Sequence, residues 1–389
     1  MFIWDLGTPY NFVAWFFLAI GLPATLWLFL LGLASLLPTR RVKTNEARHL
    51  RIAVVIPAHN ETLMIFDTVK GVFEQDYPKE AFTLMVVADN CIDDTADKAR
   101  AAGARVLERS SNPGKGQALL ETFGVLLEED WDALLVVDAD TRLHPNLLRT
   151  LSRELADGAG AIQAYYGVLN PSESRRTMAM ELALASFNGL RPRGKTNLGM
   201  SAGLFGNGFC LSRDTLEKVP YQAGSVVEDL EYHLQLLEAN IKVRFVDDVQ
   251  VTAQMPASRA DATSQRVRWE QGRMKIMTDL MPSMLGRFIR FKPGALESLI
   301  DVCIPPVSSI ALCLVAAFAL GSPTLQLIAF SALVMVVFHY TLGALRFGSL
   351  KRMFLVMGYV PYYFIWKTWT VFSSMLARAN SGWVRTKRH

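Results

Sequence analysis

Residues 132–141, which read DALLVVDADT, decide the fold of this chain. An apolar run from Ala133 to Val137 leads directly into an Asp-Ala-Asp triplet, which is typical of a short buried strand. Because side chains alternate along a strand, we expect Asp138 and Asp140 to point the same way and Ala139 to point into the fold. At the C-terminal edge of a sheet, two such carboxylates are suited to hold a hard divalent cation. The alternative is a pair of aspartates that caps the next helix.

Composition favours a membrane-associated protein with a cytoplasmic domain. The chain has 389 residues, 51% of them hydrophobic, and the apolar excess lies at its two ends. The net charge of +4 is small, and basic residues follow apolar segments, which indicates a membrane surface and argues against nucleic acid. The four cysteines form no CxxC motif and are interpreted as reduced thiols. The six histidines are scattered, which disfavours a zinc site.

Three apolar segments are predicted to cross the membrane. Residues 11–37 carry no charge and exceed the ~20 residues that a spanning helix needs. A signal peptide is the alternative, but no basic region precedes the run. Basic residues follow between Arg40 and Arg51, so the positive-inside rule places the N-terminus outside and the following domain in the cytoplasm. Residues 303–320 and 325–345 are predicted to form a membrane hairpin.

Two further segments have interfacial character. Residues 261–281 predict an amphipathic helix, and residues 353–376 predict an interfacial or re-entrant segment that keeps the C-terminus in the cytoplasm. The expected organisation is a spanning helix at 1–38, a cytoplasmic domain at 39–256, amphipathic interface helices at 257–296, and a membrane hairpin with an interfacial segment and a basic tail at 297–389.

From Arg51 onward, apolar strands alternate with helices, which predicts an α/β fold with a parallel sheet and a ligand crevice at the strand ends. Polar residues follow three of these strands, namely Asn60 and Glu61, Asp89 and Asn90, and the two aspartates of the triplet. Lys115 lies between two glycines at a predicted helix start, a place that favours an anion. The full GxxxxGK[ST] spacing is missing, so this is not a P-loop.

The second half of the domain contributes further candidate residues. Gly206 lies in GLFGNGFCLS, which is predicted to be a glycine-rich strand that approaches a ligand closely or bends tightly. Glu228 and Asp229 open a predicted helix, where acids are also favourable without any function. Within QRVRW, residues Gln265, Arg268 and Trp269 share one helix face.

The motifs between Arg51 and Gly272 resemble those of one family. In order they are PAHNE, Asp89, GKGQAL, the Asp-Ala-Asp triplet, Glu228-Asp229 and QRVRW. This region resembles the membrane-bound family 2 glycosyltransferases, the group that includes cellulose, hyaluronan and chitin-oligosaccharide synthases. Val227 stands where processive members usually have threonine, and few spans are predicted for a polymer channel. Both departures concern processivity and leave the reaction class unchanged.

The resemblance implies a GT-A nucleotide-sugar-binding domain, which is a Rossmann-like mixed sheet, flanked by transmembrane helices and an amphipathic interface helix. It implies donor contacts by Glu61, Asp89, Lys115, Asp138, Asp140, Gln265 and Arg268. Asp89 resembles the residue that contacts uridine, and Asp140, with Asp138, resembles the ligand of Mg²⁺ or Mn²⁺. Asp229 resembles the general base, with Glu228 beside it. The acceptor is expected at Trp269, Gly206 and Asn207.

The expected function is that of an inverting glycosyltransferase. It would transfer a sugar from a UDP-sugar to a growing β-linked saccharide at the cytoplasmic face of the inner membrane, in exopolysaccharide assembly and with possible export partners. The alternative is transfer of a single sugar to a lipid or lipid-linked acceptor. A membrane subunit with a nucleotide-binding domain, such as part of a transporter or channel, is a different class. It is disfavoured because the predicted spans hold no ionisable residues apart from His339, whereas a transport pathway usually needs them. A dehydrogenase is disfavoured because no GxGxxG follows the first strand.

Overall fold

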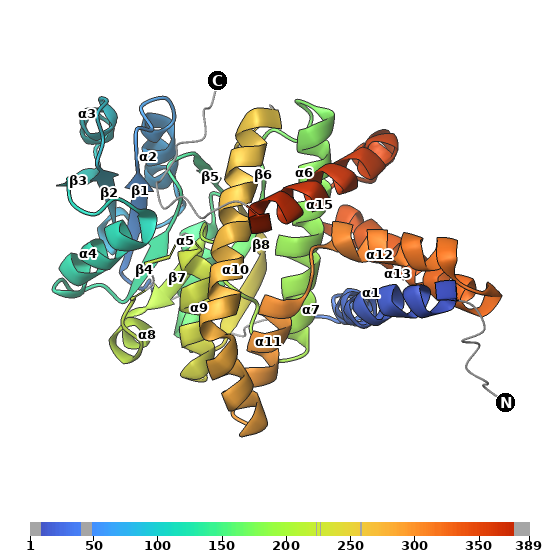
Figure 1. Cartoon of the computed structure of the whole chain (residues 1–389). Coiled ribbons are helices and arrows are strands. Elements are labelled where there is room, and N and C mark those ends of the chain that lie inside the picture. Colours follow the sequence, from blue (N-terminus) through green and yellow to red (C-terminus); the bar gives the residue numbers. More distant parts are fainter. Residues whose placement is uncertain (1–8, 40–48, 223, 226, 257–258, 377–389) are drawn as a thin grey trace.

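The computed structural model describes residues 9–39, 49–222, 224–225, 227–256 and 259–376. Figure 1 shows a domain built on one sheet, a set of helices against its side, and a helical bundle that projects away from the sheet. The predicted α/β class with a mixed sheet flanked by apolar helices is confirmed.

The first half of the sheet is parallel, as the alternation of strands and helices predicts. Its strands are β1 (Ile52–Ala58), β2 (Phe82–Asp89), β3 (Arg105–Arg109) and β4 (Ala133–Val136). Alternate residues of β1 enter two different cores, with Ile52 and Val54 on one face and Ala53 and Val55 on the other. Since both faces are covered, the strand reads as a continuous apolar run.

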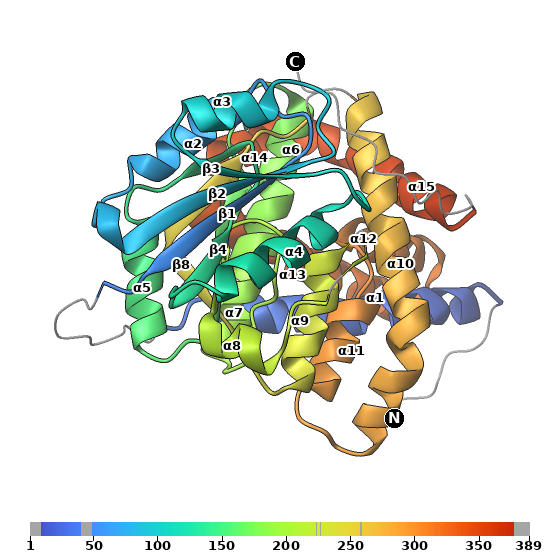
Figure 2. The same ribbon diagram turned by 90° about the vertical axis from the view of Figure 1, so that its left-hand side faces the viewer.

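Helices lie on both sides of these strands (Figure 2). One face is covered by α2 (Ile65–Phe73), α3 (Thr95–Ala101) and α5 (Leu147–Ala156), and the other by α4 (Lys115–Leu127), α8 (Arg213–Lys218) and α9 (Glu228–Glu238). The N-termini of α4 and α9 lie near the strand ends, which is where the candidate residues are found.

The second half makes the sheet mixed. It adds β5 (Thr141–Leu143), β6 (Ala161–Val168), β7 (Phe209–Ser212) and β8 (Val243–Ala253), and the complete order is β3-β2-β1-β4-β7-β6-β8-β5. Strand β7 is antiparallel to both of its neighbours, β4 and β6. Antiparallel β7 therefore brings the segment before Phe209 to the edge at which β1, β2 and β4 end.

Two strand predictions are corrected. Strand β4 ends at Val136, and the Asp-Ala-Asp triplet lies on a turn in which the N–H of Thr141 donates to the carbonyl of Asp138 at 3.2 Å. The chain has to reverse there because β5 pairs with β8. The predicted glycine-rich strand begins only at β7, since Gly206 (φ +75°) and Gly208 (φ +71°) adopt left-handed backbone conformations that a strand does not use.

Three apolar helices form the bundle: α1 (Pro9–Ala34), α12 (Val307–Leu320) and α13 (Pro323–Phe347). Two helices in the described part are long and apolar enough to cross a membrane, and a third span results if α11 (Ala295–Cys303) and α12, bent by 72°, count as one. The bundle interior is filled with fully buried side chains such as Leu18, Leu314 and Ala329. His339 joins two of the helices, because its Nδ1 lies 2.8 Å from the carbonyl oxygen of Leu28.

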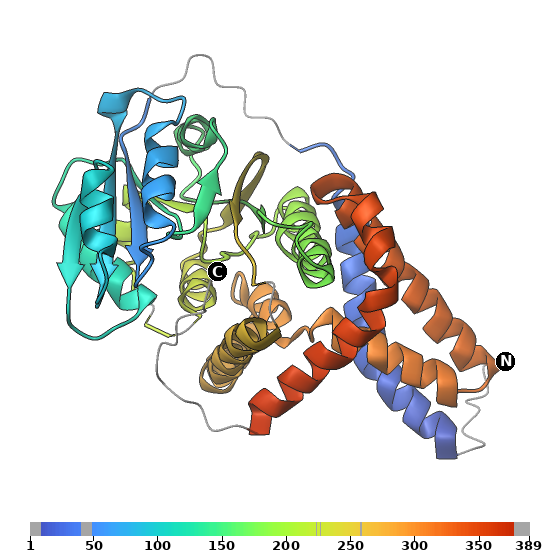
Figure 3. The ribbon, with the colours of Figure 1, turned by 90° about the horizontal axis from the view of Figure 1, so that it is seen from above.

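One long helical segment connects the sheet domain to the bundle (Figure 3). It consists of α6 (Arg175–Leu184), a π-helical turn (Ala185–Leu190) and α7 (Arg191–Asn197). Arg193 donates from Nε to the carbonyl of Ser35 at 2.8 Å. Gly194 lies directly against the backbone of Leu31 on α1, so no side chain fits between the two helices.

Replacing Gly194 by Ala is expected to lower the thermal unfolding temperature. The new Cβ would overlap with the carbonyl group of Leu31, and overpacking of this kind typically costs about 1–3 kcal/mol. Gly124 on α4 is the matched control, since a Cβ there meets nothing within 4 Å. Gly124→Ala should be neutral or stabilising by up to ~1 kcal/mol. Equal unfolding temperatures for the two variants would contradict the described contact.

The remaining helices lie between the sheet domain and the bundle or along its side. They are α10 (Arg259–Ile289), α11, α14 (Leu350–Val356) and α15 (Val360–Leu376). Helix α10 is longer than the amphipathic helix predicted at 261–281. Helix α15 buries Tyr363 and Trp366 against α6 and exposes Ile365 and Trp369. Its membrane-interfacial placement stays a prediction.

Candidate active site

Five candidate residues from distant parts of the chain meet at the N-terminus of α4. The Nζ of Lys115 lies 2.5 Å from Oδ1 of Asp138, 2.6 Å from the carbonyl oxygen of Gly206 and 3.7 Å from Oε1 of Glu228. Asp229 lies close to the same point, since a Cβ on Gly206 would be 3.3 Å from Oδ2 of Asp229 and 3.5 Å from Nζ of Lys115. The site is therefore an ammonium group surrounded by three carboxylates.

Burial and charge shift the pKa values of this cluster. Burial disfavours the charge on Lys115, but Asp138 and Glu228 outweigh it and hold the pKa of the ammonium above its usual value. Burial raises the pKa of Glu228 to about 7, against the attraction of Lys115. Burial also raises the pKa of Asp229, although the N–H of Leu230 and the charge on Lys115 oppose the shift. Such shifts are common where carboxylates take part in acid–base chemistry.

Asn207 holds the turn that carries the two aspartates. Its Oδ1 accepts a hydrogen bond from the N–H of Asp138 at 3.1 Å, and its Nδ2 donates to Oγ1 of Thr141 at 2.8 Å. Asn207 is fully buried, and its side chain holds the turn in place; its expected contact with an acceptor stays a prediction. Gln163 on β6 supports this arrangement by donating to the carbonyl of Asn207 at 2.8 Å and accepting from the N–H of Phe205 at 2.9 Å.

Asp89, at the end of β2, belongs to a second buried network. Its carboxylate forms an ion pair with Arg109 and accepts a hydrogen bond from the N–H of Gly114 at 2.8 Å. Arg109 in turn contacts Glu121 of α4 at 2.7 Å. The sequence singled out neither Arg109 nor Glu121, because an arginine at a strand end carries no motif. The network fixes the loop that precedes Lys115, and the contact of Asp89 with a uridine stays a prediction.

The other candidates lie at the same sheet edge or on α10. The backbone N–H of Glu61 donates to Oγ1 of Thr95 at 2.8 Å, beyond the end of β1, and Asp140 is 4% exposed on the turn. Gln265, Arg268 and Trp269 lie within α10, but their side chains are outside the described part of the structure. Their roles stay predictions.

The donor set at the turn suits a hard divalent cation. No group of three or more His, Cys, Asp or Glu side chains that could hold a metal occurs among the described residues. Mg²⁺ at nucleotide sites is usually held by one or two carboxylates together with substrate phosphates and water, and Asp138 and Asp140 provide this number. Asp138 already holds a cationic group, the ammonium of Lys115. When bound there, a divalent cation would neutralise charge that develops on a leaving diphosphate.

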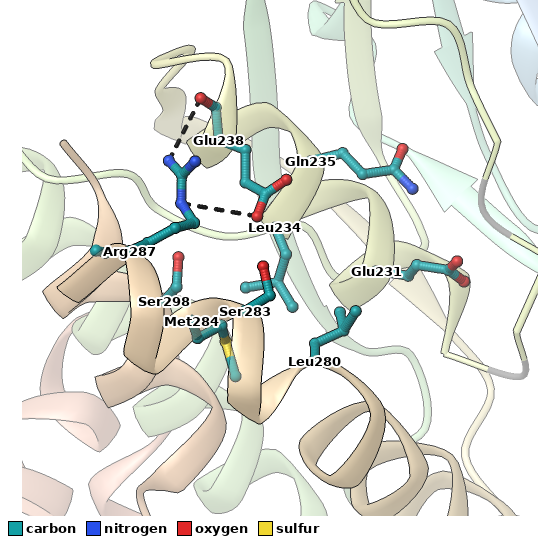
Figure 4. Close-up of a pocket in the computed structure, with 10 residues that line it drawn as sticks. Glu231, Leu234, Gln235, Glu238, Leu280, Ser283, Met284, Arg287 and Ser298 are labelled. Carbon is teal, nitrogen blue, oxygen red and sulfur yellow. Dashed lines mark hydrogen bonds and ion pairs between the residues drawn. The ribbon is translucent and has the colours of Figure 1, made fainter. Parts of the chain in front are cut away.

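A separate pocket of about 250 Å³ lies between α9, α10 and α11 (Figure 4). Leu234, Leu280 and Met284 line it with apolar side chains, and an ion pair of 3.7 Å between Arg287 and Glu238 lies at its edge. None of the candidate site residues lines this pocket.

Replacing Glu228 by Gln is expected to change how stability depends on pH. The folded-state pKa of about 7 lies above the ordinary 4.5, so the folded protein holds the proton more tightly, and stability is lost as the pH rises through 7. The variant resembles the protonated state and lacks this loss. Its advantage in free energy of unfolding should therefore grow as the pH rises from about 4.5 to about 7, by on the order of 2–3 kcal/mol at most, and level off above pH 7. A difference that stays constant across this range would contradict the raised pKa.

This sheet order matches that of the GT-A fold. The chain belongs to the glycosyl transferase family group 2, whose profile matches residues 133–348. The resemblance inferred from its motifs is therefore confirmed at the level of the family.

Individual relatives support the same class. The chain is 25% identical over 251 residues to the probable glycosyltransferase YdaM of Bacillus subtilis, covering 62% of this chain and 59% of that protein. It is 26% identical over 233 residues to the beta-monoglucosyldiacylglycerol synthase of Synechocystis, covering 57% of this chain and 47% of that protein. The chain thus spans about half the length of these curated relatives.

A solved structure shares the fold over nearly the whole chain. The mannosyltransferase PcManGT from Pyrobaculum calidifontis, in complex with GDP-Man and Mn²⁺, superposes with a TM-score of 0.59 and 19% identity. The match covers 93% of this chain and 99% of that one. At this identity the likeness establishes the fold alone.

Proposed function

We propose that this glycosyltransferase moves a single sugar from a UDP-sugar to a lipid acceptor at the membrane surface. The observation that carries the proposal is the solid apolar interior of the bundle formed by α1, α12 and α13. A polymer channel needs a polar lumen, whereas buried side chains such as Leu18 and Leu314 fill this bundle. A lipid acceptor needs no channel, because it reaches the site from within the bilayer.

The donor is bound at the ends of β1, β2 and β4. Asp89 and Lys115 hold the nucleotide, and Asp138 and Asp140 would hold Mg²⁺ or Mn²⁺, which would neutralise charge on the diphosphate. The position of Lys115 supports this assignment, because it opens α4, where backbone N–H groups and the helix dipole also favour phosphate. Gln265 and Arg268 of α10 complete the diphosphate site, and Trp269 contacts the acceptor.

Asp229 is the general base, and Glu228 supports it. The acceptor hydroxyl attacks the anomeric carbon, its proton passes to the Asp229 carboxylate, and the bond to UDP breaks. This single displacement inverts the anomeric centre. Asp229 is preferred because it is partly exposed beside Gly206, whereas Glu228 is buried against Lys115. The raised pKa of Asp229 makes it a stronger base than an ordinary aspartate.

Extension of a β-linked saccharide in exopolysaccharide assembly is the second candidate. The Glu228-Asp229 pair together with QRVRW favours it, because both motifs resemble those of the polymer synthases. Its acceptor would be a saccharide, and the lipid acceptor would then play no part.

The experiment that tests the proposal is UDP release by the purified chain with a panel of UDP-sugars and Mn²⁺. We expect release with one or few donors, and acceleration when vesicles containing diacylglycerol are added. Release that soluble oligosaccharides accelerate and vesicles do not would favour the second candidate. No release with any UDP-sugar would overturn the assignment of the donor.

A further inference from the structure

Arg191, the first residue of α7, is buried without a polar partner. It is 9% exposed, and its guanidinium forms neither a hydrogen bond nor an ion pair with any described residue. Its Nε is fully buried. Burying a charged group with unsatisfied donors is strongly unfavourable, and such groups in folded proteins have a partner. The missing partner of Arg191 is therefore expected to be a bound anion.

The neighbouring cations of α7 show that the fold satisfies such groups elsewhere. Arg193 forms an ion pair with Asp247, and Lys195 contacts Asp301 at 2.7 Å and Glu297 at 3.1 Å. Arg191, Arg193 and Lys195 are all buried, and among these three Arg191 alone forms no ion pair with a described residue. Asp301 attracts Arg191, but its carboxylate is already engaged by Lys195.

The stacking of Arg191 leaves its donors available. The guanidinium carbon lies 3.9 Å from the centre of the Phe187 ring, so the aromatic ring covers one face of the group. The N–H donors point from the edge of the guanidinium plane, and their fork matches the oxygens of a phosphate. Phe187 is 46% exposed, so the stacked pair lies next to accessible space.

The stacked pair lies between the catalytic cluster and the membrane bundle. The Phe187 ring is 6.1 Å from that of Phe205, which directly precedes Gly206 of the catalytic cluster. On the other side, Gly194 of the same helix contacts Leu31 of the membrane helix α1. A π-helical turn, a feature frequent at functional sites, immediately precedes Arg191.

A second cation reinforces the charge at this position. Arg273 on α10 donates from Nη2 to the carbonyl of Val302 at 2.9 Å, next to the bend between α11 and α12. Burial lowers the pKa of Arg191, Asp301 opposes this effect, and Arg273 adds to it. The positive charge of Arg273 acts unfavourably on that of Arg191, and an anion bound to Arg191 would offset this effect.

We propose that Arg191, with Arg273 beside it, binds the phosphate group of a membrane lipid at the junction between the catalytic domain and the bundle. The choice of a lipid as the source of the phosphate rests on the proposed function. The need for an anion rests on the burial of Arg191 and does not depend on the reaction.

The test compares Arg191→Met with the wild type in delipidated detergent, by thermal unfolding with and without added phosphatidylglycerol. Without lipid, the variant should unfold at the same temperature as the wild type or higher, because methionine removes an unpaired buried charge. Phosphatidylglycerol should raise the unfolding temperature of the wild type and leave that of the variant unchanged. Arg175→Met is the matched control: it removes an exposed charge from the same helical segment and should keep the full response.

Further arms separate the possible sources of the effect. Uncharged diacylglycerol should act equally on the wild type and on Arg191→Met, and inorganic phosphate alone should not reproduce the rise. A full response by Arg191→Met, or a rise with inorganic phosphate equal to that with phosphatidylglycerol, would overturn the lipid-phosphate site. Because binding is measured without turnover, a positive result would stand even if the lipid acceptor of the proposed function proved wrong.

Discussion

Asp229→Asn is expected to lower the rate of sugar transfer by about 10²–10⁴-fold while leaving UDP binding intact. The amide keeps the shape of the carboxylate but cannot accept the proton of the attacking hydroxyl. Asp229 accepts a hydrogen bond from the N–H of Leu230 at 2.8 Å, and an amide oxygen at this position can still accept it, so the contact between Lys115 and Asp138 should remain in place. Transfer is measured as UDP release under saturating donor, and UDP binding by calorimetry.

The neighbouring acid supplies the control for this assignment. Glu228→Gln removes a buried carboxylate that contacts Lys115 at 3.7 Å and should therefore affect donor binding more than the proton transfer step. If Asp229→Asn turned over at nearly the wild-type rate while Glu228→Gln was inactive, the roles of the two acids would have to be exchanged.

The second large effect is expected from Asp140→Ala and from removal of divalent metal. Both should abolish most of the activity, by about 10³-fold, since a metal ion at a leaving diphosphate contributes several kcal/mol of charge stabilisation. Binding of Mn²⁺ in the presence of UDP, measured by electron paramagnetic resonance, should weaken in parallel with activity. This second measurement separates loss of the metal from a general loss of structure.

Asp97→Ala is the matched control, because it removes an exposed carboxylate on α3, outside the sheet-edge cluster. It should leave Mn²⁺ binding and UDP release unchanged. Full activity of the wild type in excess chelator, or normal Mn²⁺ binding by Asp140→Ala, would contradict the metal role.

The sheet could be predicted because its central strands are buried on both faces. Residues 52–58 and 82–89 are nearly continuous apolar runs, and the structure places them in two cores at once. The predicted end of β4 was wrong. The apolar run continues through Val137, but the strand stops at Val136 because the chain turns after it to form β5. Periodicity carries no information about that reversal.

The candidate site could be predicted in part for a similar physical reason. Polar residues at the ends of parallel strands share one edge, so the approach of Lys115 to Asp138 follows from the expected topology. The contact between Asn207 and Asp138 could not be inferred, because antiparallel β7 brings together residues 69 positions apart. The unpaired state of Arg191 was equally hidden, since its pairing depends on which carboxylates its neighbours occupy.

The central claim is that a single sugar passes to a membrane lipid at the Lys115–Asp229 cluster. Mass spectrometry of lipids extracted after incubation of the purified chain with a UDP-sugar, Mn²⁺ and diacylglycerol-containing vesicles tests it most directly. The account predicts one new lipid species, heavier by one sugar residue, that is absent with Asp229→Asn. A ladder of saccharides, or UDP release with no change in any lipid, would contradict it.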